Sequence, residues 1–331
     1  SLLALIDGVR AGCTTIIDHH ASPSCVDGSL DYVERAFRDV GLSGCLCYEF
    51  TDRNVEGEGI EENVRYIGKC RESGDSQMTA LLGMHAQMTL GDGTLRRCAE
   101  AGASLDAGFH VHVAEDSCDV RDARENHRKG IMERLVDAGI AGPRSIFVHG
   151  VHLEEEAIEQ LRDTDTILIN CPESNMNNAV GNAPVLDMID RGVTIGLGTD
   201  GMSSHMISQA RAMYMSQRAK HGDPTIGFVE AAETLLHSNR RIADRLFPEA
   251  RGAIAPGQLA DIIVQDYVPF TPLNSDTVYG HLLFGLGFSS VRTTIARGKV
   301  VLDDGQFAHL DEAAIRAACV ERARAIWSRI Q

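Results

Sequence analysis

Two histidines and a glutamate lie close together in the stretch GFHVHVAED, residues 108–116. Alternate residues of a β-strand share a face, so His110 and His112 point the same way unless the strand ends between them. Glu115 follows His112 by three residues, where the strand should give way to a loop. An imidazole with a carboxylate just beyond it can bind a metal ion and carry protons. A core histidine bonded to a neighbouring strand, with Glu115 as a solvated loop acid or a helix cap, is the alternative.

Two further reactive side chains follow later strand-like runs. His149 ends the apolar run in FVHGVHL, and Asp200 ends the run in GLGTDGMSS. Taken singly, His149 could be a strand-end histidine bonded to a loop carbonyl, and Asp-Gly is a common turn pair. One strand–helix unit separates His112 from His149, however, and two short units separate His149 from Asp200. This spacing predicts that the three side chains converge. His152, in the outgoing loop, is interpreted as a structural or surface residue.

Short apolar runs alternate with helical patterns between these residues. Each run is almost wholly apolar, as a strand buried on both faces should be. Alternation of strands with helices predicts parallel βαβ units. The predicted strands are 13–20, 41–50, 79–87, 108–115, 145–150, 166–172 and 193–200, and the predicted helices are 29–40, 60–74, 93–107, 119–139, 154–163 and 183–191.

Seven strands after an initial helix fit an α/β fold of the TIM type, a (β/α)8 barrel whose first strand is missing from this chain. A doubly wound sheet is the alternative. The polar residues favour the barrel, because barrel enzymes draw active-site residues from the C-terminal ends of many strands, whereas a doubly wound sheet gathers them at one switch point. The residues at or just beyond predicted strand ends are His19, His20, His85, His112, His149 and Asp200.

The pattern changes after the last predicted barrel strand. Helices are predicted near 205–220 and 226–245. The segments GAIAPGQLADIIVQD and SVRTTIARGKVVLDDGQF are then rich in β-formers and turn residues, with no helix expected between them. We therefore predict a barrel domain over 1–251, incomplete at its N-terminus, and the C-terminal part of a small β-sandwich over 252–308. A closing segment over 309–331, with a helix at 311–330, completes the chain.

Composition argues against several classes of partner. The net charge of −16 disfavours binding to nucleic acid or anionic membranes. No apolar run approaches the roughly 18 residues that a membrane helix needs. The nine cysteines are scattered and odd in number, which indicates reduced thiols and a cytoplasmic protein. A small-molecule substrate is the expected partner, and self-association into a homo-oligomer is compatible with the sequence.

In this order, the motifs HVAE, VHGVHL, NCPESNMNNAVGNAPV and GLGTDG resemble the amidohydrolase superfamily. They are most similar to its aminohydrolase branch, which contains cytosine-deaminase-like and chlorohydrolase-like enzymes. The stretches DHHASPS and SNMNNAVG resemble the SsnA-type aminohydrolases in particular, and the tail APGQLADIIVQDY…ARGKVV resembles the C-terminal β-sandwich strands of the family. The resemblance covers nearly the whole chain and implies a metal-dependent hydrolase.

The resemblance also implies a role for each reactive side chain. His112 resembles the metal ligand of strand five, and Asp200 resembles the strand-eight ligand that takes a proton from the metal-bound water. Glu115 resembles the acid/base that moves protons to the substrate ring nitrogen and the leaving group. His149 resembles the strand-six histidine that orients the attacking hydroxide or the new carbonyl oxygen. The implied substrate-binding residues are His85, Ser174 and Asn175, although a polar loop that caps the next helix explains the last two equally well.

One departure from the family concerns the first barrel strand. Family members carry a His-x-His pair there that supplies two more metal ligands, and this chain has no such strand. His110 and His112 cannot replace the pair, since strand five must supply its own ligand, and the adjacent side chains of His19 and His20 point apart. We therefore expect the pair in a segment upstream. The isolated chain is expected to bind metal poorly, since zinc sites normally have more than two protein ligands.

The sequence predicts a single metal ion and a hydrolytic reaction. Binuclear relatives often bridge two metals with a carboxylated lysine on strand four, and 79–87 contains neither lysine nor an acidic residue. Zinc is the expected ion, with iron as the alternative. The predicted reaction is deamination of an amino-substituted nitrogen heterocycle by an activated water. Hydrolysis of a C–Cl or cyclic amide bond on the same scaffold, and a binding barrel without catalysis, are the alternatives.

Overall fold

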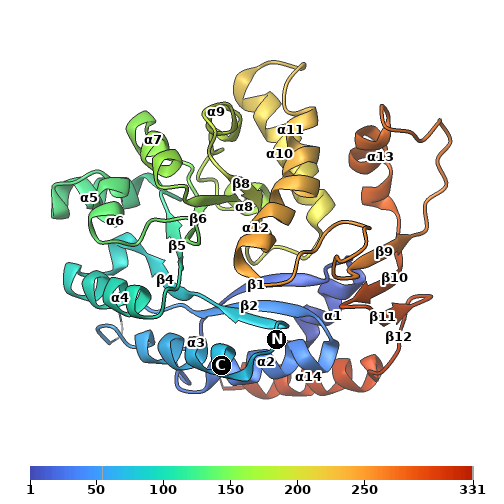
Figure 1. Cartoon of the computed structure of the whole chain (residues 1–331), viewed down its shortest axis with the longest axis horizontal. Helices are drawn as coiled ribbons and strands as arrows, with labels where there is room; N and C mark the ends of the chain where they lie inside the picture. The colour runs from blue at the N-terminus through green and yellow to red at the C-terminus, as the bar shows by residue number, and fades with distance from the viewer. Residues whose placement is uncertain (54, 330–331) are drawn as a thin grey trace.

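Parallel strands and helices alternate along most of the chain (Figure 1). The computed structural model describes residues 1–53 and 55–329. The parallel strands are β1 (Thr15–His20), β2 (Ser43–Tyr48), β3 (Met78–Ala80), β4 (Leu82–Ala86), β5 (Phe109–Val113), β6 (Ile146–His149), β7 (Ile167–Asn170) and β8 (Ile195–Leu197). The helices around them are α1 (Leu2–Arg10), α2 (Ser29–Val40), α3 (Ile60–Ser73), α4 (Asp92–Ser104), α5 (Ser117–His127), α6 (Ile131–Asp137), α7 (Glu155–Asp163), α8 (Pro172–Asn177), α9 (Val185–Asp190), α10 (Met206–His221), α11 (Phe228–Glu233) and α12 (Asn239–Leu246).

The parallel strands are arranged in sequence order. Strands β1, β2 and β3 pair in that order, and strands β4 to β8 pair in that order. The two groups are joined where the Leu81 N–H donates to the Leu46 carbonyl at 3.1 Å, and where Phe50 forms a bridge with Met84. A doubly wound sheet would reverse its strand order at a switch point. The continuous order confirms the predicted barrel-type sheet, and β1 and β8 are its two ends among the described residues.

Two apolar clusters hold the strands in place. The larger lies between the strands and the surrounding helices, where Tyr66 and Phe147 are fully buried. The smaller lies on the inner side of the sheet, where Ile167 belongs to the same cluster as Ile242 of α12. A Cβ at Gly196 of β8 would lie 2.5 Å from Ile242 Cδ1, so only glycine lets α12 approach the strand this closely.

Helix α12 also provides hydrogen bonds to β8 through the side chain of its first residue. Asn239 Oδ1 accepts from the Leu197 N–H at 2.8 Å, and Asn239 Nδ2 donates to the Leu197 carbonyl at 3.0 Å. The amide therefore pairs with β8 as a neighbouring peptide group would. Asn239 follows a π-helical turn at Thr234–Ser238, a feature that often marks functional regions. Leu197 precedes Asp200 by three residues, so Asn239 fixes the strand that carries Asp200.

We expect Asn239→Ala to lower the free energy of unfolding by about 1–3 kcal/mol, because it leaves the Leu197 N–H and carbonyl without their partner. Urea denaturation of both proteins measures this change. Asn126→Ala is the matched control, since Asn126 is an exposed helical residue bonded only to Asp122 in the same helix. It should change stability by less than about 0.5 kcal/mol. An equally small effect at Asn239 would contradict a structural role for its amide.

The structure differs from the predicted elements in three places of the barrel. The predicted strand 79–87 is two strands separated at Leu81, because β3 pairs with β2 whereas β4 pairs with β5. The predicted helix 119–139 is divided into α5 and α6, since Arg128 adopts a left-handed φ of 56° and Gly130 begins a new helix. The polar segment after Cys171 is helix α8, not only a loop.

The C-terminal part forms an antiparallel sheet in the order β12-β11-β10-β9. Its strands are β9 (Ile262–Gln265), β10 (Val291–Ala296), β11 (Lys299–Asp303) and β12 (Gln306–Phe307). The expectation that no helix separates the two β-rich segments is wrong, because α13 (Val278–Phe284) lies between β9 and β10 and buries Leu282 and Leu283. Helix α14 (Glu312–Trp327) closes the chain as predicted. Residues 330 and 331 of the predicted closing segment lie outside the described residues.

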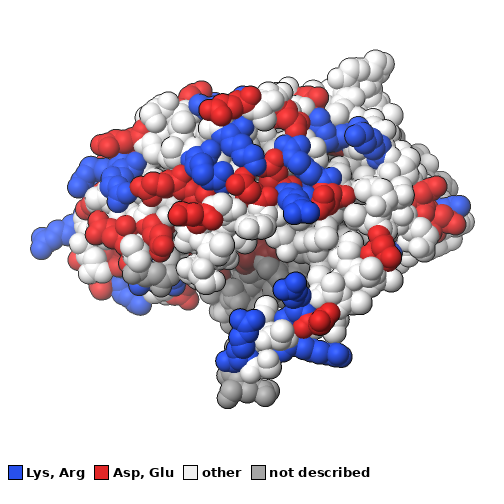
Figure 2. Space-filling model, turned by 90° about the horizontal axis from the view of Figure 1, so that it is seen from below, with Lys and Arg blue, Asp and Glu red and all other residues white. Residues whose placement is uncertain are grey.

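Ion pairs attach the closing helix to the first one. Arg10 of α1 pairs with Glu312, and Arg316 Nη2 lies 2.7 Å from Asp7 Oδ1. On the face seen from below in Figure 2, basic and acidic side chains are interspersed. Across residues 1–53 and 55–329, no helix has the length and apolar character needed to cross a bilayer.

Candidate active site

His112 lies near the end of β5, and one of its two ring nitrogens already has a hydrogen-bond partner in the protein. Its Nδ1–H must donate to the His85 backbone carbonyl, because a carbonyl oxygen can only accept. The Nε2 atom is therefore left as an acceptor, the state in which an imidazole binds a metal ion. The His112 ring stacks on His149 with 5.5 Å between centroids.

His149, at the end of β6, is oriented in the same way. Its Nδ1 lies 2.8 Å from Asn175 Oδ1, and Asn175 Nδ2 faces Asn170 Oδ1 at 3.4 Å. With the amide oriented so, His149 Nδ1–H donates, and its Nε2 faces a Glu115 carboxylate oxygen at 3.7 Å. Burial lowers the pKa of His149, while the charge of Glu115 acts in the opposite direction. His149 is consequently neutral at pH 7 in this environment.

Glu115 and Asp116 are adjacent acids with different partners. Glu115 Oε1 accepts from Asn178 Nδ2 at 3.0 Å, and its other carboxylate oxygen faces His149. Asp116 instead caps α5, where its side chain accepts from the Cys118 N–H at 2.8 Å. Asp116 is therefore the N-cap of α5, and Glu115 is the acid that faces the site.

Asp200 follows β8 and accepts two hydrogen bonds. The Ser174 hydroxyl donates to its Oδ2 at 2.5 Å, and the Gly201 N–H donates to its Oδ1 at 2.7 Å. Burial acts to raise the pKa of Asp200, but these hydrogen bonds and the nearby histidines outweigh it, so that the pKa is lowered. The carboxylate is therefore ionised at neutral pH and available as a ligand or a proton acceptor.

Three strand ends around the site adopt a left-handed backbone. Ala114 after β5 has a φ of 51°, His149 at the end of β6 has a φ of 78°, and Asp200 after β8 has a φ of 51°. Residues other than glycine enter this region rarely and at a cost in energy. The turns place the side chains of His149 and Asp200, and that of Glu115, at one end of the sheet.

The predicted substrate-binding residues also lie here. His85 of β4 has its ring 5.6 Å from that of His112, and its Nδ1 is 3.2 Å from Thr89 Oγ1. Ser174 and Asn175 are buried on α8, where they bond to Asp200 and His149. His152 bonds to the Val180 carbonyl through its Nε2, as expected of a structural histidine. The structure thus brings the predicted site residues together, and their individual roles remain predictions.

Two donors beside His112 were not assigned to the site from the sequence, since His19 was named only as a strand-end residue and Glu49 was not singled out. The side chains of His19 and Glu49 approach each other, with Nε2 to Oε2 at 3.4 Å, and their donor atoms and that of His112 lie within 4.8 Å of one another. His20 points elsewhere, toward Ser22, as its adjacency to His19 predicts. Glu49 directly follows β2, and a carboxylate just beyond a strand end is the signal that could have identified it. The predicted strand 41–50 included Glu49 within an apolar run, so this signal was not recognised.

The protonation states of these donors suit a cation. Burial lowers the pKa of His19 to about 4, even though Glu49 acts to raise it. Burial acts to raise the pKa of Glu49, but His19 and the other histidines reverse this and lower it. A neutral imidazole and an ionised carboxylate are the forms that bind metal. The donor atoms of His112, His19 and Glu49 are thus close enough together, and of the right types, to bind a divalent cation such as zinc.

Comparisons with known proteins identify the family of this chain. The model of the amidohydrolase family matches residues 3–301. The 5-methylthioadenosine/S-adenosylhomocysteine deaminase of Desulfitobacterium hafniense (strain Y51) is 30% identical over 97% of this chain and 73% of its own. The 5'-deoxyadenosine deaminase of Methanosarcina mazei is 28% identical over 100% of this chain and 76% of its own.

Solved structures share the fold. An adenosine deaminase from Xanthomonas campestris with bound zinc superposes with a TM-score of 0.85 at 22% identity, covering 98% of this chain and 74% of its own. The atrazine chlorohydrolase TrzN from Arthrobacter aurescens TC1, complexed with zinc, gives 0.80 at 17% identity, covering 97% and 75%. The chain spans about three quarters of the length of these proteins.

Proposed function

Since this chain belongs to the amidohydrolase family, we propose that it deaminates an amino-substituted nitrogen heterocycle of the adenosine type. The relatives that cover nearly all of it are named as deaminases of 5-methylthioadenosine, S-adenosylhomocysteine or 5'-deoxyadenosine. The observation that carries the proposal is the position of Glu115, held between Asn178 and His149 beside His112. A carboxylate so placed can carry protons as well as complete a charged site.

His112 and Asp200 would hold the divalent cation, with Glu49 as a further donor beside His112. Zinc is the proposed ion, since solved relatives of this fold contain it, and iron is the alternative. When bound, such an ion supplies Lewis acidity and lowers the pKa of a water molecule toward about 7. The absence of a lysine or an acid in 79–87 supports one catalytic ion.

Asp200 is the proposed acceptor of the proton that leaves the attacking water. Its carboxylate is ionised before the reaction, because Ser174 and the Gly201 N–H stabilise the negative charge. Ser174 keeps Oδ2 in a fixed direction, so we infer that Ser174 positions Asp200 as well as lining the pocket. Asn175 likewise positions the ring of His149, because its side-chain oxygen bonds to His149 Nδ1.

Glu115 is the proposed carrier of protons to the substrate. One oxygen is oriented by Asn178, and the other faces the Nε2 of His149. Glu115 would give one proton to a ring nitrogen and regain a proton that originates from the attacking water. The other proton of that water would leave with the amino group as ammonia, so that Asp200 and Glu115 end the cycle in their starting forms. His149 then orients the oxygen that replaces the amino group, and His85 is the proposed contact to the heterocycle.

Release of ammonia tests this proposal. We expect the metal-loaded protein to release one equivalent of ammonia from 5-methylthioadenosine, S-adenosylhomocysteine, 5'-deoxyadenosine or adenosine. Chloride release from a chlorinated triazine without ammonia from the nucleosides would instead support the chlorohydrolase alternative. Tight binding of a nucleoside with no turnover would support a binding barrel. A cytoplasmic location and self-association remain predictions from composition.

A further inference from the structure

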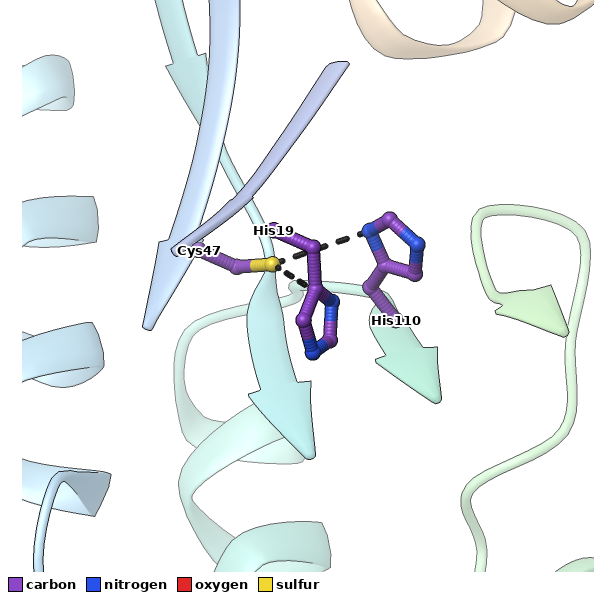
Figure 3. A group of neighbouring side chains, drawn as sticks. All are labelled: His19, Cys47 and His110. Atoms are coloured by element: carbon purple, nitrogen blue, oxygen red, sulfur yellow. Dashed lines mark hydrogen bonds between the residues drawn. The ribbon is translucent and has the colours of Figure 1, made fainter. Parts of the chain in front are cut away.

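The side chains of His19, Cys47 and His110, all of types that can bind metal, converge on one another (Figure 3). Cys47 Sγ of β2 lies 3.4 Å from His19 Nδ1 of β1 and 3.6 Å from His110 Nδ1 of β5. His19 and Cys47 are register partners in the parallel β1–β2 pair. Cys47 and His110 are buried and His19 is partly buried, so water has limited access to them. Nothing in the proposed deamination uses Cys47 or His110.

Hydrogen bonding does not account well for this cluster. A thiol has one proton, yet the Cys47 sulfur faces two imidazole nitrogens and also the Asp18 backbone carbonyl at 3.6 Å. The thiol can donate to only one of these three acceptors. The remaining contacts would be weak N–H···S bonds or lone pairs that face sulfur, because sulfur is a poor acceptor.

The distances fit metal coordination. With Zn–S of about 2.3 Å and Zn–N of about 2.0–2.1 Å, a tetrahedral ion holds its sulfur and nitrogen ligands roughly 3.5 Å apart. The two S···N distances observed here are 3.4 and 3.6 Å. We propose that His19, Cys47 and His110 bind a second, thiophilic divalent cation of the Zn²⁺ class, separate from the ion of His112 and Asp200. Binding would release the Cys47 thiol proton to solvent as the metal–sulfur bond forms.

The surroundings of the cluster support this proposal. The other ring nitrogen of His19, Nε2, faces Glu49 at 3.4 Å, and a metal-ligating histidine commonly directs its second nitrogen to a carboxylate. Strand β4 lies between β2 and β5, and at Gly83 it has no side chain. A Cβ at Gly83 would lie 2.9 Å from Cys47 Sγ and 2.5 Å from the Tyr48 carbonyl oxygen. Glycine therefore keeps open the space across which Cys47 and His110 meet.

X-ray absorption at the zinc edge tests the proposal without any substrate. We expect the whole protein, loaded with Zn²⁺ alone, to show zinc–sulfur scattering at about 2.3 Å in addition to nitrogen and oxygen scattering. Loading with Co²⁺ alone should likewise give the near-ultraviolet charge-transfer band of a thiolate–cobalt bond. His112, Asp200 and Glu49 contain no sulfur, so an ion held only by them gives neither signal.

Two variants assign the signal to one sulfur. Cys47→Ser should abolish both signals, whereas Cys45→Ser, which removes a buried thiol two residues away on the same strand, should retain them. Nitrogen and oxygen scattering alone in the loaded wild type would overturn the proposal, and that result decides even if Cys47→Ser does not fold. Sulfur scattering that persists in folded Cys47→Ser would overturn it as well. A failed deaminase assay affects neither readout.

Discussion

Replacing Glu115 with glutamine is expected to lower turnover by about 10²–10⁴-fold while the fold and the bound metal are retained. Glutamine preserves the size of the side chain and can still bond to Asn178, but it cannot carry a proton. The loss should therefore appear in kcat at equal metal occupancy, with ammonia release as the measurement. A loss of this size would indicate that Glu115 transfers a proton in the reaction.

Asp116→Asn is the matched control for this experiment. It changes the adjacent carboxylate to an amide, but Asp116 caps α5 and points away from His149. Turnover should stay within about threefold of wild type, because asparagine is also a good helix cap. Glu115→Gln within the same threefold range would mean that the glutamate is structural, and the deaminase mechanism would have to be given up.

Asp200→Asn is expected to weaken the catalytic metal by more than the 10–100-fold that loss of an outer partner typically causes. The change removes the negative charge that a divalent cation needs and leaves the size of the side chain unchanged. Zinc affinity measured by competition with a chelator tests this. The titration is best carried out with Cys47→Ser in both proteins, so that the site at Cys47 cannot contribute. Because both proteins carry Cys47→Ser, any effect of that substitution alone cancels in the comparison.

Ser174→Ala provides a graded comparison. It removes the hydrogen bond to Asp200 Oδ2 but keeps the carboxylate itself. Its expected loss of affinity is roughly 10–100-fold, smaller than that of Asp200→Asn. Equal losses in both variants would mean that Asp200 acts only through its hydrogen bond to Ser174. Unchanged affinity in Asp200→Asn would show that Asp200 is not a ligand.

The barrel could be predicted because its strands are nearly uninterrupted apolar runs. Strands β2 and β6 are buried along their whole length, and their residues other than Ser43 and His149 are mostly apolar, so both runs stood out in the sequence. The missed helices depend on contacts that the sequence does not display. Helix α8 is polar, yet Ser174 and Asn175 are buried in it because Asp200 and His149 bond to them. The division at Leu81 depends on which strand each half pairs with.

The site residues that could be predicted are those that directly follow an apolar, strand-like run. His112, Glu115, His149 and Asp200 each follow an apolar run, and the spacing of the runs indicated one shared edge. The cluster at Cys47 depends instead on lateral register. His19 aligns with Cys47 because β1 and β2 pair as they do, and His110 reaches across β4. Neither the alignment of His19 with Cys47 nor the contact of His110 with Cys47 can be inferred from the spacing of these residues in the sequence.

The left-handed backbone at His149 and Asp200 restricts which amino acids these two positions can accept. Asp, Asn and His enter that backbone region several times more readily than other residues with a side chain. The residue types that the chemistry requires are therefore also types that the backbone tolerates. An alanine at either position would combine the lost functional group with added strain, so an alanine scan would overstate both contributions. Few amino acids satisfy both the chemistry and the left-handed backbone at His149 and Asp200. We therefore expect natural sequence variation at these two positions to be confined to a very small set of amino acids.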